Sequence, residues 1–346
     1  MARLGNLTKV RTGKLDANAA SPDGKYPFFT CSRETLRISS YQYDCECVLV
    51  AGNGDLNVKY YDGKFDAYQR TYIIESQDKS ILFVPYLYYF LDGYVETLRE
   101  QAIGGVIKYI KLGNLTEADI PLPNLEGQIK IVNRLQKLEN LISLRKQQLA
   151  KLDELVKARF VEMLGDPIKN TLGLPTKTLG EVCLLKAGMT TSADAIFDYD
   201  IEHQIPCYGG NGIRGYVKES TQHGTYPIIG RQGALCGNVQ LAQGDFHATE
   251  HAVLVSPLQQ MNIYWLFFLL KYMDLYRYHT GAAQPGLAVK TLNTVDIPFA
   301  DLASQDEFAA LARKVNGQRL TIQQSLDKLM ILKKSLMQEY FGGDRK

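Results

Sequence analysis

The sequence predicts an α+β protein in which one unit, a globular region followed by a long helix, occurs twice. The stretch from Leu125 to Leu164 has the periodicity and the flanking signals of a single helix. The chain also aligns with itself after a shift of 177 residues, which brings Pro121 onto Pro298. The regions that precede the two helices are rich in strand-forming residues.

The first long helix is predicted between two boundary signals. Pro121-Leu-Pro123-Asn124 precedes it, with Asn124 in the N-cap position, and Gly165-Asp-Pro167 follows it as a stop signal. Apolar residues recur inside it at steps of three and four, which is the heptad seam of a helix that packs along a partner. Arg145 and Arg159 also fall on the seam, where we expect them to meet acidic or polar partners. The apolar seam residues are Ile131, Leu135, Leu138, Ile142, Leu149, Leu152, Val156 and Met163.

The partner helix is expected in the same chain. Under the 177-residue shift, Gln128 corresponds to Gln305 and Leu152 to Leu329. Gly317 weakens this second helix near its start, by roughly 1 kcal/mol relative to alanine. The second seam comprises Val315, Ile322, Leu326, Leu329, Leu336 and Tyr340.

These observations divide the chain into four expected segments. They are a globular domain over residues 1–123, a helix over 124–165, a second domain over 166–300 and a second helix over 301–346.

Each globular region is predicted to contain short strands and one buried helix. The apolar helices are expected near residues 81–98 and 263–278, and both apolar runs are too short to span a bilayer. Turns are expected at Gly52-Asn-Gly54, at Asp62-Gly63 and at Gly224.

The charge distribution limits the ways in which the chain could bind nucleic acid. Net charge is +2 overall, but it is −1 over residues 1–120 and −2 over residues 166–300. The globular regions are therefore not general polyanion binders, and contacts with nucleic acid would come from local patches. Six cysteines without a CxxC pair, and a start without a signal peptide, predict free thiols and a cytoplasmic location.

Two motifs resemble catalytic or metal-binding patterns without fitting them. Residues 210–215 match the dinucleotide pattern G-x-G-x-x-G, but strand-like residues follow, so we predict a glycine-rich hairpin. His247 and His251 are four residues apart in a segment that reads as strand, where such side chains lie about 13 Å apart. This disfavours a metal site and favours a loop that contacts a ligand. The chain has no Asn-Pro-Pro-aromatic methyltransferase motif and no phosphate-binding loop motif, so no catalytic residue is predicted.

Polar, aromatic and basic side chains gather at the predicted turns of both regions. Arg, Asn and Gln can read guanine and adenine edges, while Lys and Tyr can hold phosphates. Ordinary surface polarity explains any one of these residues more simply, but two clusters on duplicated domains favour DNA binding. The candidates are Asn53, Asn57, Lys59, Tyr61, Lys64, Gln69 and Arg70 in the first region, and Tyr208, Asn211, Arg214, Lys218, Arg231, Gln232, Asn238 and His251 in the second.

The whole chain resembles the specificity (S) subunits of type I restriction-modification systems. The segment over residues 120–132 resembles the entry to the family's conserved helix, and residues 147–166 resemble its exit. Leu4-Gly5 and Leu179-Gly180 resemble the openings of the family's two target-recognition domains. The second helix departs from the pattern, because Arg319 and Lys333 lie on its seam and Gly317 interrupts it.

The resemblance implies two α+β target-recognition domains held apart by two antiparallel helices that form a coiled coil. Each domain would read one half of a bipartite double-stranded DNA target. The chain itself would be non-catalytic and would carry no cofactor. It would dock two methyltransferase subunits, which use S-adenosylmethionine, and through them the endonuclease-translocase subunits. A duplicated coiled-coil adaptor whose domains bind protein is the main alternative, and the missing motifs disfavour a stand-alone methyltransferase.

Overall fold

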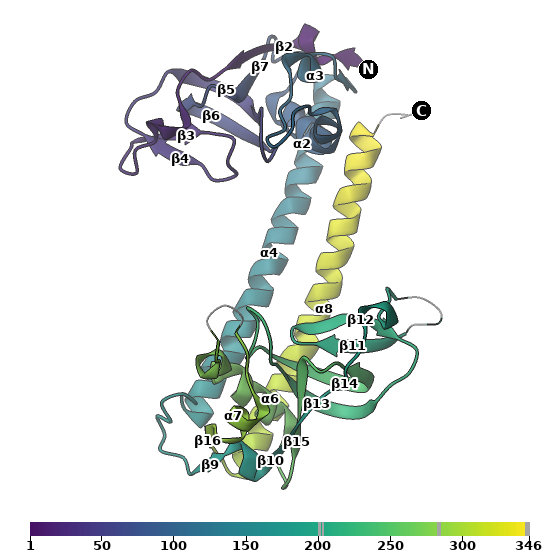
Figure 1. Ribbon diagram of the computed structural model, residues 1–346. Coiled ribbons are helices and arrows are strands. Elements are labelled where there is room, and N and C mark those ends of the chain that lie inside the picture. The colour runs from purple at the N-terminus through teal and green to yellow at the C-terminus, as the bar shows by residue number, and fades with distance from the viewer. Residues whose placement is uncertain (200–201, 203, 282–284, 343–346) are drawn as a thin grey trace. The chain divides into compact units, whose positions relative to one another are not determined.

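The chain folds into two compact units. The computed structural model describes residues 1–199, 202, 204–281 and 285–342. One unit comprises residues 1–146 and 324–346, and the other comprises residues 147–323. Each contains one α+β domain and part of each long helix (Figure 1), which confirms the predicted fold class.

The domain of the first unit is built on a six-stranded sheet in the order β2-β7-β5-β6-β3-β4. Neighbouring strands are antiparallel except for β3 and β6, which pair in parallel. Its elements are β1 (Ala2–Arg3), α1 (Leu4–Leu7), β2 (Thr8–Thr12), η1 (Ala17–Ala19), β3 (Tyr26–Phe29), β4 (Leu36–Ile38), β5 (Tyr43–Ala51), β6 (Val58–Ala67), β7 (Thr71–Ser76), α2 (Val84–Gln101), α3 (Leu112–Thr116) and β8 (Asp119–Ile120).

The domain of the second unit repeats this topology. Its sheet has the order β10-β15-β13-β14-β11-β12, and its single parallel pair, β11 with β14, occupies the place of β3 with β6. The two sheets thus match in strand order, which confirms the internal duplication predicted from the sequence. Its elements are β9 (Thr176–Thr178), α5 (Leu179–Val182), β10 (Cys183–Ala187), η2 (Ala193–Ala195), β11 (Ile205–Gly209), β12 (Gly212–Val217), β13 (Gln222–Gly230), β14 (Val239–Ala248), β15 (Ala252–Pro257), α6 (Ile263–Tyr272), η3 (Leu275–Tyr278), α7 (Val289–Asn293) and β16 (Asp296–Pro298).

The predicted turns at Asp62-Gly63 and Gly224 are wrong, because these residues lie inside β6 and β13. Gly63 has φ +130° and pairs with Cys45, while Gly224 has φ +123° and pairs with Gly244. Glycine tolerates these positive angles, which let a long strand bend without ending. Beyond Gly63, β6 pairs with β5 as far as Phe65, and its last two residues, Asp66 and Ala67, pair with β3.

Each sheet is packed on both faces, and the alternation along a strand divides its side chains between two clusters. In β5, Val48 and Val50 join the cluster that includes α2, whereas Cys47 and Leu49 join a smaller cluster on the other face. In the second unit, Val253 and Val255 of β15 face α6, while its Ala252 and Leu254 face the smaller cluster. This period of two matches the geometry of a strand.

The two apolar helices are buried, as predicted. Leu87 and Leu91 of α2 and Leu266 and Leu269 of α6 are at most 1% exposed. The apolar helix of the second domain, α6, ends at Tyr272 and not at residue 278 as expected. Asp274 adopts a left-handed conformation (φ 49°), which stops the helix. Within the described residues, no helix is long and apolar enough to cross a membrane.

The long helices are α4 (Leu125–Leu164) and α8 (Leu302–Phe341), and they pair in antiparallel fashion within each unit. In the second unit Phe160 packs edge-on against Phe308, with ring centroids 5.0 Å apart. The predicted apolar seam residues of both helices are buried or half-buried. Gly317 does not interrupt α8, and the space where a Cβ would stand is open.

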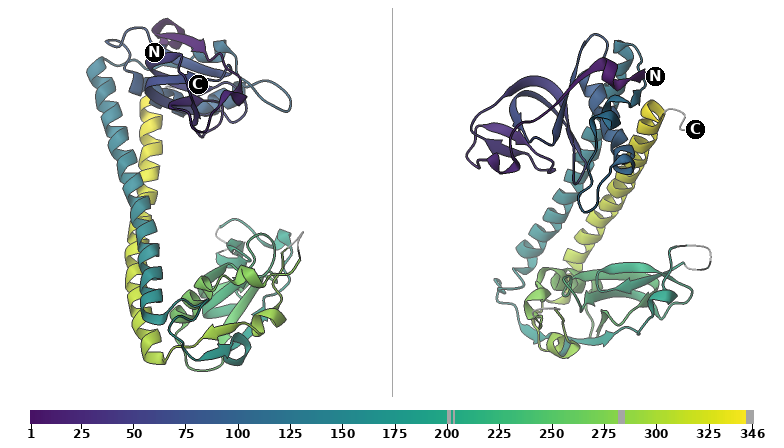
Figure 2. Two further views of the ribbon diagram at one scale, coloured as in Figure 1. Left: turned by 90° about the vertical axis from the view of Figure 1, so that its left-hand side faces the viewer. Right: turned by 45° about the horizontal axis from the view of Figure 1, so that its top comes forward.

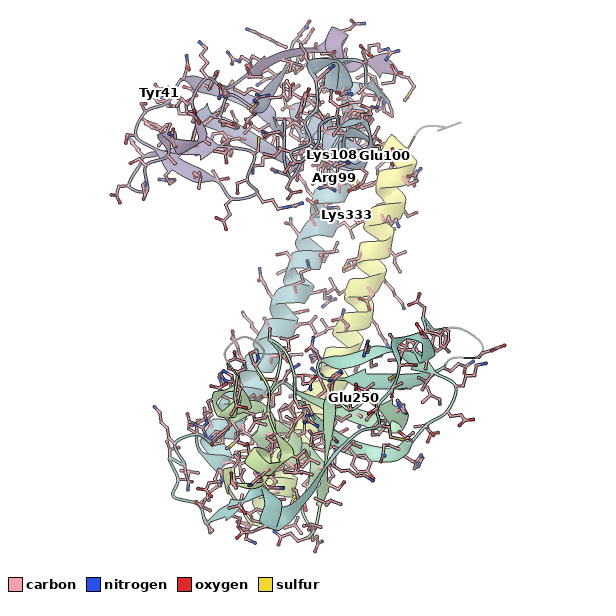
Figure 3. The ribbon with its side chains drawn as sticks, in the orientation of Figure 1. Tyr41, Arg99, Glu100, Lys108, Glu250 and Lys333 are labelled. Atoms are coloured by element: carbon pink, nitrogen blue, oxygen red, sulfur yellow. The ribbon has the colours of Figure 1, made fainter. Side chains whose placement is uncertain are left out.

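The polar residues on the α8 seam are paired with acidic residues of α4. In the first unit, Lys333 of α8 (labelled in Figure 3) lies 2.6 Å from Glu139, which also accepts a hydrogen bond from the Tyr89 hydroxyl (2.7 Å). In the second unit, Arg319 Nε lies 3.4 Å from Asp153. Arg159 forms an ion pair with the acidic Glu162 on its own helix.

A buried glutamine joins each long helix to the domain that precedes it, and we call this contact the glutamine joint. Gln128 is 0% exposed; its Oε1 accepts from the Phe83 amide (2.9 Å), and its Nε2 donates to the carbonyls of Ile81 and Pro123. Gln305 is 1% exposed and repeats the arrangement with the Asn262 amide and the Ala300 carbonyl.

Replacing either joint glutamine with leucine is expected to destabilise the unit that contains it. The substitution keeps the approximate side-chain volume but leaves buried backbone groups without partners, at a cost of about 1–3 kcal/mol. Urea denaturation followed by fluorescence of Trp265, the one tryptophan of the chain, reports on Gln305→Leu, and circular dichroism reports on Gln128→Leu. Gln136→Leu, at an exposed position of α4, should leave stability nearly unchanged. Equal midpoints for Gln305→Leu and Gln136→Leu would show that the joint does not stabilise the fold.

Candidate nucleic-acid interface

Three loops of the first domain meet at one end of its sheet. They are the β3–β4, β5–β6 and β6–β7 loops, and we call this region the first loop end. The Arg70 carbonyl accepts hydrogen bonds from the Gly52 amide (2.8 Å) and from the Cys31 thiol (3.5 Å). The Asn57 side chain donates to the carbonyls of Cys31 (2.9 Å) and Asp55 (2.8 Å). These bonds link residues from all three loops.

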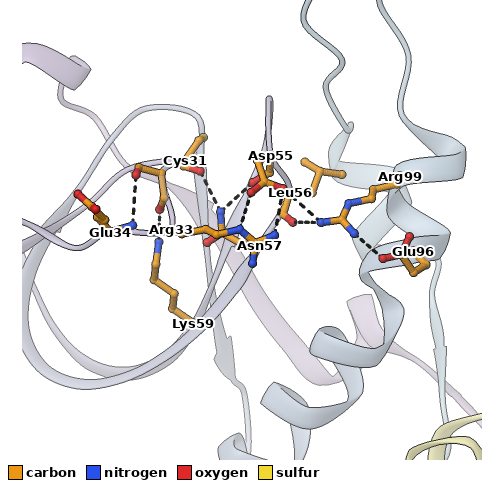
Figure 4. A network of polar contacts seen from close by, with 10 residues as sticks. Cys31, Arg33, Glu34, Asp55, Leu56, Asn57, Lys59, Glu96 and Arg99 are labelled. Atoms are coloured by element: carbon orange, nitrogen blue, oxygen red, sulfur yellow. Dashed lines mark hydrogen bonds and ion pairs between the residues drawn. The ribbon is translucent and has the colours of Figure 1, made fainter. Parts of the chain in front are cut away.

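Arg33, Asp55 and Arg99 form an ion-pair network at the first loop end (Figure 4). Arg33 Nε lies 2.6 Å from Asp55 Oδ2, and Arg99 of α2 lies 3.2 Å from Asp55 Oδ1 and also contacts Glu96. The hydrogen bond from Arg33 holds the pKa of the Asp55 carboxyl below its usual value. Both arginines therefore have an internal counter-charge in this structure.

Of the candidates in the first region, Asn53, Gln69 and Arg70 lie on these loops, with Gln69 and Arg70 exposed. Lys59 is half-buried beside them and donates to the Ser32 carbonyl, and burial lowers its pKa. Asn57 is 9% exposed, and its amide holds the loops together.

Tyr61 and Lys64 lie further along β6, away from the first loop end. The Tyr61 ring packs against Phe29 (5.1 Å) and Phe65 (5.6 Å), and the Lys64 ammonium lies 4.8 Å from the centroid of the exposed Tyr41 ring. Figure 3 labels Tyr41.

Sequence reasoning missed Arg33, Asp55 and Arg99, which the fold brings together. No short-range pattern marks this triad, because its members lie on two loops and a helix. Sequence reasoning also missed the chain after α2, whose Lys108 carbonyl accepts from the Gly54 amide (3.0 Å).

The corresponding loops of the second domain form a second loop end. The β11–β12 turn packs against the end of β13, and glycine permits this approach: a Cβ on Gly230 would lie 1.9 Å from the Gly210 carbonyl oxygen. The Arg231 amide donates to the His251 carbonyl (3.0 Å), and the Leu287 amide donates to the Arg231 carbonyl (2.8 Å). The predicted glycine-rich hairpin is confirmed as β11 and β12.

A hollow of about 650 Å³ lies at the second loop end. Four candidates line it: Asn211, Arg214, Gln232 and His251. Asn238 stabilises the edge of the hollow, because its Nδ2 donates a hydrogen bond to the Asn211 side-chain oxygen (2.5 Å).

The remaining candidates of the second region do not line this hollow. Tyr208 packs edge-on against Phe246, and burial raises its pKa. Lys218 forms an ion pair with Glu202 (2.7 Å). Arg231 is half-buried, and its backbone is hydrogen-bonded to His251 and Leu287.

The two histidines of the segment over residues 247–251 make different contacts. His247, near the end of β14, is held by the hydroxyls of Thr191 (2.8 Å) and Thr221 (3.2 Å), and burial lowers its pKa. The strand expected for this segment ends at Ala248; Glu250 and His251 form a turn, and His251 Nε2 lies 3.1 Å from Glu250. The described part of the chain contains no group of three or more His, Cys, Asp or Glu residues arranged to hold a metal.

Comparison with known proteins identifies related sequences along nearly the whole chain. The family model described as "Type I restriction modification DNA specificity domain" matches residues 1–154 and 173–333. The specificity subunits of the Escherichia coli type I restriction enzymes EcoprrI and EcoDI are 49% and 41% identical over 139 and 154 residues. These matches cover 40% and 44% of this chain but only 35% and 34% of the two relatives. A putative type I specificity subunit of Mycoplasma genitalium is 25% identical over 98% of this chain and 92% of its own length.

Solved structures share the fold. The type I restriction-modification S subunit from M. genitalium matches with a TM-score of 0.72 at 18% identity, covering 98% of this chain and 95% of its own. A chain of a type I R-M system solved to explain complex assembly and conformational transition matches with a TM-score of 0.56 at 15% identity, covering 99% and 97%.

The packing of the second loop end predicts opposite effects for two glycine substitutions in the same unit. Gly230→Ala would force its Cβ into the Gly210 carbonyl, so we expect a loss of roughly 1–3 kcal/mol in the free energy of unfolding. Gly317→Ala, in open space on α8, should gain about 1 kcal/mol from helix propensity. Urea denaturation monitored by Trp265 fluorescence measures both. A neutral or stabilising Gly230→Ala would contradict the close approach of the two segments.

Proposed function

Because the chain belongs to the type I restriction-modification DNA specificity family, we propose that it is the DNA sequence-specificity subunit of a type I restriction-modification enzyme. The observation that carries this proposal is the duplicated loop end. The same three loops of two equivalent domains gather Arg, Asn and Gln side chains, which are suited to reading base edges. Two DNA-binding domains on one chain would suit a bipartite double-stranded DNA target, one domain for each half-site.

The residues proposed to contact DNA are the candidates whose side chains lie at the loop ends. In the first domain these are Asn53, Gln69 and Arg70, with Lys59 beside them. In the second domain they are the four that line the hollow, namely Asn211, Arg214, Gln232 and His251. Asn57 and Asn238 stabilise this interface, because their side chains are bonded to its loops. The rings of Tyr61 and Tyr208 pack inside the domains.

The long helices are proposed to dock the catalytic subunits. Both helices carry apolar side chains that the described part of the chain leaves more than two-fifths exposed: Leu141, Leu144 and Leu155 on α4, and Leu320, Met330, Ile331 and Leu332 on α8. Apolar surface of this kind favours protein partners. We assign it to two methyltransferase subunits, which would bind S-adenosylmethionine and connect to the endonuclease-translocase subunits. The chain itself would lack catalytic activity and act in the cytoplasm.

The helices would also set the distance between the half-sites. Each has 40 residues, which corresponds to roughly 60 Å of helix. One helical turn of DNA is about 34 Å, so a spacer of this length can straddle base pairs that neither domain reads.

Replacing the second domain tests the proposal against the alternative of a protein-binding adaptor. Substituting residues 166–300 with the matching domain of another family member should change one half of the methylated sequence in the host genome. The other half and the gap should stay the same, because the first domain and both helices are unaltered. Methylome sequencing of cells that produce each chain together with its methyltransferase gives the result. Genomes with no methylation that depends on this chain would favour the adaptor instead.

A further inference from the structure

A fourth loop extends the loop end of each domain. In the first domain it covers residues 103–109, between α2 and α3. The Ile103 amide donates to the Tyr109 carbonyl (3.0 Å) and the Tyr109 amide donates to the Ile103 carbonyl (2.9 Å), so the two arms of the loop are closed on each other. In the second domain the same pair of bonds joins Thr280 and Gly286 (both 2.8 Å). The shift of 177 residues brings one pair onto the other, so the loop belongs to the duplicated unit.

Backbone hydrogen bonds attach the fourth loop of the first domain to the β5–β6 loop. The Gly54 amide donates to the Lys108 carbonyl (3.0 Å), and the Ile110 amide donates to the Gly52 carbonyl (2.9 Å). Corresponding bonds attach the loop of the second domain to the β13–β14 loop. Figure 2 shows the domain of the first unit, coloured purple to blue, in two further views. Because Asn53 lies between the two bonded glycines, the fourth loop is held beside a side chain that we propose to contact DNA.

The tip of the fourth loop in the first domain carries apolar side chains that project into solvent. Val106 is fully exposed and Ile107 is 63% exposed, while Ile103 and Tyr109 at the base of the loop are 44% and 36% exposed. Gly104 keeps the loop narrow, because it has φ +118° and a Cβ there would lie 2.7 Å from the Ile107 carbonyl oxygen. Val and Ile are stiff at χ1, so the tip loses little side-chain freedom when it binds a ligand.

The surroundings of the tip favour DNA over a protein as its ligand. Residues 101–111 contain two lysines and no acidic residue, and both Lys108 and Lys111 are exposed. Figure 3 labels Lys108. Lysines beside a base-contacting loop can neutralise phosphates. A stable protein interface takes roughly 20–30 residues from each partner, which is far more than this narrow tip offers.

We propose that this tip recognises a thymine in the half-site of the first domain, with Val106 and Ile107 packing against the 5-methyl group of the base in the major groove. The thymine methyl is the apolar group that a base edge presents there, whereas the other positions are donors and acceptors that an aliphatic side chain cannot satisfy. The contact leaves the bases stacked, so it avoids the cost of inserting a side chain between them. The inference rests on the proposed function and adds the base and the residues that contact it.

Replacing thymine with uracil tests this contact, because the two bases pair alike and differ only in the 5-methyl group. The domain exchange described above identifies the half-site that the first domain recognises. Each full chain is purified with its methyltransferase partner, and its affinity is measured for duplexes in which every thymine of the target is changed to deoxyuridine in turn. Val106→Ala and Ile107→Ala shorten the apolar side chains of the tip. Ile81→Ala is the matched control, because Ile81 is 47% exposed and precedes α2, outside the fourth loop.

The half-site of the first domain should contain at least one A·T pair. At one of its thymines, the change to uracil should weaken binding by the wild-type complex about fourfold, which corresponds to the loss of one buried methyl group. Val106→Ala and Ile107→Ala should reduce this preference for thymine, and Ile81→Ala should keep it. Thymines in the other half-site should respond alike in all four chains.

The outcomes that contradict the proposal are distinguishable. If the wild-type complex has no sequence preference, the proposed function fails and this inference fails with it. If the wild type is specific, the thymine contact alone is wrong when no thymine of the first half-site responds to uracil, or when both tip variants keep the full preference at unchanged melting temperature. Loss of the methyltransferase from both tip variants, but not from Ile81→Ala, would instead show that the tip binds protein.

Discussion

The structure depends on the way each domain is joined to its long helix. A helix can fix the position of a domain only if the contact between them resists rotation and bending. Gln128 and Gln305 supply that resistance, because each buried amide bonds to backbone groups on both the helix entry and the segment before α2 or α6. The bonds are directional and enclosed in apolar cores, where losing one is costly. The same joint occurs at both repeats, so both domains are oriented by the same device.

Within each unit, α4 and α8 also pair in antiparallel fashion. Apolar seam residues supply most of the contact, and the charged seam residues of α8 are matched by Glu139 and Asp153 of α4. The two loop ends differ in their contacts. The first contains an ion-pair network around Asp55, whereas the second contains a hollow lined by Arg214 and His251. A duplicated scaffold can therefore present two different recognition surfaces.

The sequence predicts the scaffold better than the interface. The heptad seam and the 177-residue repeat determine helix positions, because periodicity and capping are local signals, and α4 spans Leu125–Leu164 as expected. The strand turns at Gly63 and Gly224 were mispredicted, because glycine permits a bend within a strand as readily as a turn between strands. At the loop ends, polarity at the predicted turns selected Arg214, Gln232 and His251, which line the hollow of the second domain. Polarity alone could not separate these residues from Tyr61 and Asn57, whose side chains make contacts inside the domain. The Arg33–Asp55–Arg99 network depends on tertiary contacts that no sequence pattern reveals.

We propose that the paired helices set the gap between two half-sites. Inserting one heptad at matched places in both helices, after Lys146 in α4 and after Gln323 in α8, would lengthen the pair by about 10 Å while keeping its seam in register. Since one base pair advances DNA by about 3.4 Å, methylome sequencing should show both half-sites unchanged and the gap longer by about three base pairs. An unchanged gap in a chain that still directs methylation would contradict the account.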